Sequence, residues 1–556
     1  MTFSVPTQGK PLADISFFPY GVGHRDGGVC LELNLGPYRI LLDCGLADLT
    51  PLRKRDPGAI DLVVCSHAHG DHALGLWQLH QQFPHIPILT SGVTQRLLPL
   101  NWLGVDVPVF SQVLPWRSPQ EILPNLKVEL MPAGHLPGAA LVLLEYHNGD
   151  RLYRVVYTGD YCLSHLQLVD GLALAQLRGL RPDVLILEGQ YGSRRLPHRR
   201  QQEKQFIQAI EAVLAKGRNI LLPVPPLGLA QEILKLLRTH HQFTGRQVNL
   251  WAGKGVAGGC DAYQEILAYL PDNVRNFAQH QPLFWDDKVY PHLRPLDGPQ
   301  GKLSLSSPSL VVTESWPGAW PSPPALPGLW TVFLPRLVEL PDCLVNFAWE
   351  NLGQFPQYEL ADYLLADHSD GRNTTQLIHN LRPQHLVFVH GERSNIEDLT
   401  SLEELQSRYQ LHSPAAGNWV ALPIGDRFVQ PTPPLPQIYE GEIHELEPDK
   451  NVHHLGEVAI HLDGQIMENS RWAKFGETGI VQARWQGEEL ILRGISQREL
   501  LRQSQTIRGL ADGDCCTNCL YFQHYHCRNP ESPLMGLQVR GDGHCPVFRS
   551  ADNVQS

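Results

Sequence analysis

The chain has 556 residues, of which 42% are hydrophobic and 18% are charged, so we expect a folded protein with two to four domains. The formal net charge of −12 excludes a generally basic surface, so a nucleic acid would have to bind a local patch or metal ions. No apolar run is long enough to span a bilayer, and the first residues lack the pattern of a signal peptide. We therefore expect a cytoplasmic protein that makes no membrane contact.

The first 192 residues alternate predicted strands with helices, and most strands run into polar residues. A helix is expected at 73–83, and strands are expected within 27–45 (two, around a Gly-Pro turn), 61–66, 126–135, 154–160 and 183–192. Such alternation is typical of a layered α/β fold, in which polar residues at strand ends can form a site.

The character of the sequence changes at about residue 193. A helix is predicted at 199–217, a buried strand at 219–225 and a second helix at 230–240, followed by loops rich in proline and tryptophan. The strand HLVFVHGE at 385–392 returns to the pattern of the first part. We therefore interpret the intervening segment as an inserted domain.

A proline-rich linker begins at 431–437, and strands are predicted beyond it at 456–462, 479–485 and 488–495. The expected domain bounds are 1–192 and 361–430 for the two parts of the first domain, 193–360 for the inserted domain, 431–500 for a small β-rich accessory module and 501–556 for a cysteine-rich module.

The motif CSHAHGDH at 65–72 places His67, His69, Asp71 and His72 directly after an apolar strand. Imidazole and carboxylate groups are the donors that zinc prefers at catalytic sites. A strand that ends in a loop can direct several side chains at one point. Taken singly, residues at later strand ends, such as Asp160 and His135, could simply cap a turn or lie in a loop. Their joint placement predicts a metal site.

Seven motifs resemble, in order, those of the metallo-β-lactamase superfamily and, within it, the β-CASP nucleases. They are LLDCG, CSHAHGDH, AGHLPGAA, YTGDY, LEGQYG, LADHSDG and FVHGE. The resemblance covers about residues 12–425. It implies a four-layer αββα sandwich with an inserted β-CASP α/β domain, here followed by small C-terminal modules. It also implies the activity of RNase J-type enzymes and of the endonuclease subunit of the mRNA cleavage and polyadenylation machinery.

The resemblance also implies the role of each site residue. One zinc ion is assigned to His67, His69 and His135, and a second to Asp71, His72 and His390, with Asp160 bridging the two. Asp43 is expected to orient ligands through hydrogen bonds, as carboxylates behind metal ligands do. His368, held by Glu188, is expected to protonate the leaving oxygen. Catalysis is thus expected to need Asp71, His368, Glu188 and Asp43.

Imidazole at His69, where diiron relatives carry a carboxylate, favours zinc, with manganese as the alternative. His390 matches the RNA-processing members, which have a histidine at that motif. The chain departs from the family pattern where hydroxyl groups or an arginine are usual, at Gly189, Gln190, Leu229 and Ala139. These losses are expected to weaken or retune phosphate binding. The basic run SRRLPHRR at 193–200 either offers a path for a phosphate backbone or is a solvated helix start.

Five of the 11 cysteines lie between 515 and 545, whereas the other six are scattered through the first 343 residues, as is usual for reduced thiols. The C-x2-C pair Cys516 and Cys519, together with Cys527 and Cys545, predicts one structural zinc ion or an iron–sulfur cluster. A small module often needs such a metal to fold. The alternative is a set of unrelated reduced cysteines.

These observations predict a zinc-dependent ribonuclease that hydrolyses single-stranded RNA in RNA processing or decay. Two alternatives stay open: a metallo-hydrolase of small esters or thioesters, and an RNA-binding scaffold with weakened catalysis. The inserted domain argues against the first, because two lobes suit a polymer substrate, and the complete ligand set argues against the second. The C-terminal modules are candidates for contacts with RNA-processing partners or with a second copy of the chain.

Overall fold

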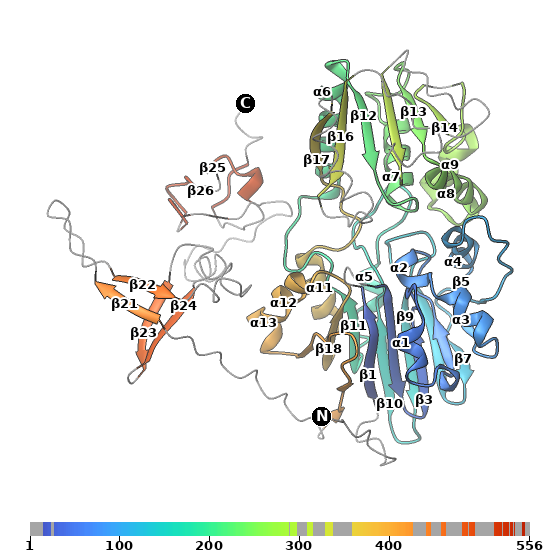
Figure 1. The fold of residues 1–556 in the computed structure, drawn as a ribbon, viewed down its shortest axis with the longest axis vertical. Coiled ribbons are helices and arrows are strands. Elements are labelled where there is room, and N and C mark those ends of the chain that lie inside the picture. The colour runs from blue at the N-terminus through green and yellow to red at the C-terminus, as the bar shows by residue number, and fades with distance from the viewer. Residues whose placement is uncertain are drawn as a thin grey trace. The chain divides into compact units, whose positions relative to one another are not determined.

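The computed structural model describes residues 15–23, 27–288, 290–296, 308–314, 329–336 and 358–425, the C-terminal strands 441–445, 458–462, 481–486 and 489–494, and residues 516–524, 526–532, 534–537, 539 and 547–550. The chain divides into two compact units, Met1–Ser193 with Arg199–Val429, and Arg194–His198 with Gln430–Ser556. Figure 1 shows the elements of both units.

Two seven-stranded sheets form the centre of the first unit (Figure 1). In the first sheet the order is β20-β1-β2-β3-β4-β5-β6, with strands Val420–Ala421, Ile15–Val22, Val29–Leu35, Tyr38–Leu42, Leu62–Val64, Ile88–Ser91 and Gln112–Leu114. In the second sheet the order is β19-β18-β11-β10-β9-β8-β7, with strands Gln410–His412, His385–Val389, Val184–Glu188, Leu152–Tyr157, Ala140–His147, Leu126–Pro132 and Gln120–Leu123.

A continuous apolar core joins side chains of the two sheets. Leu42 and Val64 of the first sheet pack in one buried cluster with Val155, Ile186 and Val387 of the second. Strands β4, β11 and β18 are buried along their whole length, which is why they appear in the sequence as largely apolar runs. Helices lie outside the sheets and complete the layers: α1 Thr50–Arg53, α2 Gly70–Ala73, α3 Leu76–Gln82, α4 Gly92–Leu97, α5 Leu174–Leu177, α11 Gly371–Leu381, α12 Arg393–Thr400 and α13 Glu403–Gln406.

Strand direction explains why polar residues gather at one edge of this sandwich. Strand β3 is parallel to β4 in the first sheet, and β10, β11 and β18 are parallel neighbours in the second. Strand β8 runs the same way as β10, because each is antiparallel to β9 between them. The carboxyl ends of these strands therefore meet at one edge, and the polar residues that follow them lie close together.

The inserted segment forms a third sheet in which every neighbouring pair is parallel. Its order is β14-β13-β15-β12-β16-β17, with strands His292–Pro295, Asn249–Ala252, Ser309–Thr313, Asn219–Pro223, Trp330–Pro335 and Tyr358–Tyr363. Its helices are α6 Arg199–Ala215, α7 Leu229–Thr239, α8 Lys254–Glu265 and α9 Asp272–His280. This sheet and its helices are called the inserted lobe below.

The second unit contains the strand pairs β21 Gly441–Glu445 with β22 Val458–Leu462, β23 Val481–Gln486 with β24 Glu489–Gly494, and β25 Phe522–Gln523 with β26 His526–Cys527. Three of these strands coincide with those expected at 456–462, 479–485 and 488–495. The linker at 431–437 and Cys545 lie outside the described residues. Nowhere in the described parts of the chain is a helix long and apolar enough to cross a membrane.

The α/β fold class with the metallo-β-lactamase sandwich is confirmed, but one expected helix differs. In place of a single helix at 73–83, the chain forms α2 and then α3, which begins only at Leu76. The break falls at Gly75, whose backbone N–H donates to the carbonyl of Cys44 at 2.9 Å. This N–H is therefore taken out of the helical hydrogen-bond pattern, and a Cβ atom at Gly75 would lie 2.6 Å from the carbonyl oxygen of Leu46, so the close approach requires glycine.

The loop that carries CSHAHGDH packs against a second glycine. A Cβ atom on Gly45 would lie 1.6 Å from the carbonyl oxygen of Asp71, whereas one on Gly27 would meet nothing within 4 Å. Only a residue without a side chain at position 45 therefore allows the backbone around Asp71 to lie where it does.

We predict that Gly45→Ala destabilises the fold by about 3 kcal/mol or more, because backbone atoms of the ligand loop would have to move. Thermal unfolding followed by circular dichroism measures this, with Gly27→Ala as the matched control that unfolds like the wild type. Equal unfolding midpoints for the two variants would contradict the packing described above.

Candidate metal centre

The predicted ligands follow the strand ends that the fold brings together. His67, His69, Asp71 and His72 lie after β4 or in α2, His135 follows β8, Asp160 follows β10, and His390 follows β18. Their donor atoms form two neighbouring groups, each with four residues, and Asp160 belongs to both.

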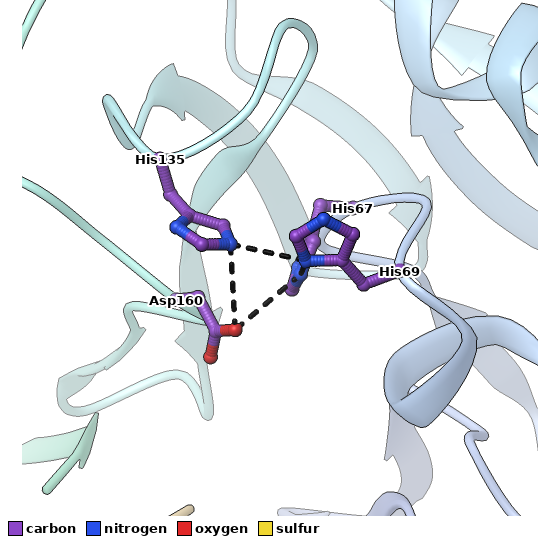
Figure 2. Close-up of side chains that lie close together, drawn as sticks. All are labelled: His67, His69, His135 and Asp160. Carbon is purple, nitrogen blue, oxygen red and sulfur yellow. Dashed lines mark hydrogen bonds and ion pairs between the residues drawn. The ribbon is translucent and has the colours of Figure 1, made fainter. Parts of the chain in front are cut away.

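The first group consists of His67, His69, His135 and Asp160, whose side chains point toward one another in Figure 2. The Nδ1 atom of His69 lies 3.2 Å from Nε2 of His67 and 3.1 Å from Nε2 of His135. The Oδ2 atom of Asp160 lies 3.4 Å and 3.7 Å from the same two Nε2 atoms. Ligands bound at about 2.1 Å to a tetrahedral ion lie roughly 3.4 Å apart, so this spacing suits a metal ion.

The second group consists of Asp71, His72, Asp160 and His390. The Nε2 atom of His72 lies 3.6 Å from Oδ2 of Asp71 and 3.3 Å from Oδ1 of Asp160. The Nε2 atom of His390 lies 3.2 Å from Oδ2 of Asp71 and 3.4 Å from Oδ2 of Asp160. The Oδ2 atom of Asp160 thus lies near histidines of both groups, and its Oδ1 atom lies near His72 of the second group, so this one carboxylate can serve both groups.

Hydrogen bonds on the far side of three imidazoles determine which nitrogen faces the centre. The Nδ1–H of His72 donates to the Asp43 carboxylate at 2.7 Å, and the Nδ1–H of His135 donates to the Asp367 carbonyl at 3.0 Å. Both oxygens can only accept, so the proton is on the nitrogen in each case. The Nε2–H group of His69 donates to the Leu227 carbonyl at 3.3 Å. In the neutral form of each ring, the opposite nitrogen is therefore a lone-pair donor directed at the centre.

Asp43 is the carboxylate that holds this side of the site together. Its side chain is fully buried and accepts hydrogen bonds from the backbone N–H of Ser66 at 2.6 Å, the Ser66 hydroxyl at 2.7 Å and the Tyr157 hydroxyl at 2.5 Å, in addition to His72. Because the Ser66 hydroxyl donates to Asp43, it can accept the Nδ1–H of His67 at 3.0 Å. Asp43 thus orients His72 directly and His67 through Ser66.

Buried polar atoms at the centre test whether the residues present suit a metal ion. The Nε2 atoms of His72 and His390 and the Oδ1 atom of Asp160 are buried and have no hydrogen-bond partner among the residues that the structure describes. A buried polar group without a partner costs free energy, so such atoms are rare in folded proteins. All three face the second group, and a metal ion there would satisfy them.

The charges at the centre also suit a cation. Burial lowers the pKa of His67 well below its usual range, so this ring is neutral and its lone pair is free near pH 7. Burial acts in the same direction on His72, but the carboxylates of Asp160, Asp71 and Asp43 outweigh it and raise the pKa of His72 to about 10. The carboxylates therefore favour a positive charge at this place, which a divalent ion would supply instead of the proton on His72.

The predicted pair of His368 and Glu188 lies beside the first group. The Nδ1 atom of His368 donates to Oε2 of Glu188 at 2.7 Å, and the other Glu188 oxygen accepts the backbone N–H of Tyr161 at 2.7 Å. The ring of His368 lies 4.5 Å from that of His135, centroid to centroid. Burial tends to lower the pKa of His368, but Glu188 and then Asp367 raise it to about 9, so the ring carries a proton near neutral pH.

The structure gives physical reasons for some of the departures from the family pattern. A Cβ atom on Gly189 would lie 3.1 Å from Ile396 and 3.2 Å from Leu399 of α12, so a serine would be crowded there. Leu229 and Ala139 are buried and cannot meet a substrate directly. The side-chain oxygen of Gln190 is buried without a hydrogen-bond partner among the described residues, and nothing in the structure explains this substitution.

Sequence reasoning missed four groups at this site. Ser66, Tyr157 and the carbonyl of Leu227 contact the ligands or Asp43, and Tyr191 donates to the side chain of Asp367 at 2.9 Å. Tyrosine and serine are common in strands and turns, and a backbone carbonyl carries no side-chain signal. The position of Tyr157 three residues before Asp160, on the same strand end, was the one hint available in the sequence.

The basic run and the cysteine-rich tail were the other two segments with a predicted functional role. Arg199, the seventh residue of the run, is buried and donates to the Ala366 carbonyl at 2.8 Å, so it is a structural residue. In the tail, Cys516 and Cys527 are buried side chains of one small apolar cluster. Within the described residues these cysteines form no metal-binding group, and the fourth predicted ligand, Cys545, lies outside those residues. The tail metal stays a prediction.

Comparison with known proteins gives consistent relatives. Residues 38–224 match the family described as Beta-lactamase superfamily domain. The uncharacterized protein sll0514 from Synechocystis sp. is 82% identical over 550 residues, which cover 99% of each chain. The probable RNase MJ4 from Methanocaldococcus jannaschii is 29% identical, over 40% of this chain and 56% of its own length. Integrator complex subunit 11 from Danio rerio is 23% identical, over 73% of this chain and 74% of its own.

We predict that Tyr157→Phe weakens metal binding by about 10- to 100-fold, the usual cost of removing a hydrogen bond behind a metal ligand. The cause is the loss of one of the donors that fix the Asp43 carboxylate. Titration with a competing chelator measures the affinity. Tyr153→Phe, on the same strand but away from Asp43, is the control. Equal affinities in the two variants would contradict the role of Tyr157.

Proposed function

This chain belongs to the metallo-β-lactamase superfamily, within its β-CASP nucleases, and we propose that this metal-dependent hydrolase is a zinc-dependent ribonuclease that cleaves single-stranded RNA. One observation carries the proposal: seven imidazole and carboxylate side chains from separate strand ends direct their donor atoms into two adjoining groups. Two ions would be held there, one by His67, His69 and His135 and the other by Asp71, His72 and His390, with Asp160 shared between them.

The donor set favours zinc, with manganese as the alternative. Five of the seven ligands are imidazoles, and imidazole with few carboxylates suits zinc better than magnesium or calcium, which prefer oxygen ligands. When bound, a pair of such ions lowers the pKa of a coordinated water and neutralises charge on a phosphate group in the transition state.

The chain's own groups supply the remaining chemistry of phosphodiester hydrolysis. The pKa of His368, raised to about 9, keeps the ring protonated on both nitrogens near neutral pH, so Nε2 carries a proton while the Nδ1–H is engaged by Glu188. Its ring lies between His135 and His390, at centroid distances of 4.5 Å and 6.0 Å, so this proton is held next to both ligand groups. We infer that His368 delivers it to the leaving oxygen, while Glu188 keeps the ring in the required tautomer and orientation.

Two further observations support RNA as the substrate. The relatives include proteins named as a probable RNase and as an endoribonuclease. The inserted lobe also lies directly against the metal centre, since Leu227 of that lobe contacts His69. An extended polymer bound between this lobe and the sandwich would be presented to the ligand groups, whereas a small ester needs no such second surface.

We predict two tightly bound zinc ions per chain in the hydrolase site and a loss of at least one in Asp160→Asn, because Asp160 serves both groups. Elemental analysis of protein purified without chelator measures the metal content. The double variant Cys516→Ser with Cys519→Ser tests the C-terminal cysteines separately. Its metal content should be one ion lower than that of the wild type only if these cysteines share a metal. Less than one ion per wild-type chain would refute the binuclear site.

We predict that His368→Ala keeps its metal content and loses about 10²- to 10⁴-fold in turnover, the usual range for a lost general acid. Single-turnover cleavage of labelled RNA and elemental analysis are the two measurements. His379→Ala is the matched control, because His379 lies on α11 and contacts Tyr409 away from the centre. Loss of zinc from the His368 variant would show that this residue is instead a ligand.

We predict that the enzyme cleaves a single-stranded RNA oligonucleotide faster than DNA of the same sequence, and that both exceed a chromogenic lactam or a thioester. The second surface of the inserted lobe favours a polymer over a small substrate, and His390, which matches the RNA-processing members, favours RNA over DNA. The products of end-labelled, 5′-phosphorylated oligonucleotides measure the rates. Equal or faster cleavage of DNA would overturn the RNA assignment, and turnover of only the small substrates would favour the esterase alternative.

A further inference from the structure

We propose that the inserted lobe is itself a part of the metal centre, because the backbone carbonyl of Leu227 positions the ligand His69. In this view Gly228 and Gln231 are positioning residues that hold the carbonyl in place. The inference rests on the proposed metal centre but is independent of the choice of RNA as substrate. It gives the inserted lobe a task beyond covering a bound polymer.

The contact joins residues that lie 158 positions apart in the sequence. The Nε2 atom of His69 lies 3.3 Å from the Leu227 carbonyl oxygen, which can only accept, so the proton of the neutral ring resides on Nε2. The lone pair is then on Nδ1, the atom that faces His67 and His135. Without this acceptor, the ring could turn or change tautomer, and its donor atom would leave the first group.

His69 depends on this contact more than the other ligand histidines do. The side chains of His67, His72, His135 and His390 are all buried, whereas that of His69 is only partly buried. Packing therefore restrains the other four rings. Within the part of the chain that the structure describes, His69 is the one ligand imidazole that donates a hydrogen bond to the inserted lobe, so the position of that lobe determines its geometry.

A set of hydrogen bonds holds the Leu227 carbonyl where His69 needs it. Gln231, which is fully buried, accepts the backbone N–H of Gly228 at 2.8 Å and donates to the carbonyl of Pro226 at 2.9 Å. It also donates to the carbonyl of Val256 in α8 at 3.1 Å. One side chain thus fastens both residues that flank Leu227 and ties them to the body of the inserted lobe.

Gly228 itself cannot carry a side chain without disturbing the contact. Its φ angle of +89° lies in the left-handed region, and a Cβ atom there would lie 3.3 Å from Nε2 of His69. The same Cβ atom would lie 3.3 Å from Leu136, the residue after the ligand His135. The close approach of backbone to ligand is therefore built around a glycine.

Glu232, the residue after Gln231, anchors the inserted lobe to the sandwich. The buried carboxylate of Glu232 accepts the backbone N–H groups of Gln167 at 2.6 Å and Leu168 at 2.8 Å, and it lies 3.6 Å from Arg199. Residues 228–232, GLAQE, thus orient a ligand at one end and join the two lobes at the other. This task needs no arginine at position 229, where the sequence departs from the family pattern.

The test compares Gly228→Ala with Gly217→Ala. Gly217 is also in the inserted lobe with a positive φ angle of +71°, but a Cβ atom there meets nothing within 4 Å. Both variants therefore place a side chain at a positive φ angle, and only Gly228→Ala also crowds His69. We expect Gly228→Ala to bind one of its two metal ions about 10- to 100-fold more weakly, and Gly217→Ala to match the wild type.

Two measurements that do not depend on activity provide the readout. Chelator titration followed by elemental analysis gives the affinity of each ion, and the visible absorbance of Co²⁺-substituted protein reports the ligand geometry. Circular dichroism establishes that each variant is folded. If Gly228→Ala does not fold, Gln231→Met replaces it, because methionine is of similar size but makes none of the three hydrogen bonds, and the same selective loss is expected.

The outcomes separate this inference from the proposed function. Wild-type affinity for both ions in Gly228→Ala and Gln231→Met, or an equal weakening of both ions, would overturn the positioning role while leaving the metal centre intact. Absence of bound metal from the wild type would instead overturn the proposed function together with this inference. Selective weakening of one ion, with an altered Co²⁺ spectrum, would support the inference.

Discussion

The arrangement of the site depends first on the buried carboxylate of Asp43. It accepts hydrogen bonds from Ser66 after β4, from Tyr157 on β10 and from the ligand His72, so it joins the two sheets at the edge where the ligands lie. A buried carboxylate is costly unless it is fully hydrogen-bonded, and removing one partner leaves that cost uncompensated. The ligand His67 also depends on this anchor, because Ser66 in turn orients its ring.

The apolar sandwich supplies the free energy that keeps such a polar cluster together. Each fully buried aliphatic side chain between the sheets contributes about 1.5–3 kcal/mol, and the shared cluster spans nearly every long strand of the two sheets. That surplus allows the fold to hold several carboxylates and unpartnered imidazole nitrogens at one edge. A metal ion then converts a locally unfavourable arrangement into a stable one, which is why metal binding and fold stability are expected to be coupled.

In the proposed enzyme, the chemistry is divided between the sandwich and the inserted lobe. The sandwich provides the ligands and the pair of His368 and Glu188, whereas the lobe reaches the centre through the carbonyl of Leu227. The departures from the family pattern lie mainly in packing: Gly189 leaves room for α12, and Leu229 is buried. They change side chains around the centre without removing a ligand.

Local signals in the sequence by itself were enough to predict the ends of several strands and the types of metal-binding side chain that follow them. Apolar runs and clustered histidines are local signals, so β4, β10 and β18 and the residues after them could be predicted without a structure. Tertiary structure alone decided which ring nitrogen of His69 faces the centre, because its partner Leu227 is a backbone carbonyl from a distant lobe. It also decided the break at Gly75, where packing against Cys44 and Leu46 overrides a helical pattern. Contacts between residues far apart in the chain leave no periodicity to detect, and backbone atoms have no residue type.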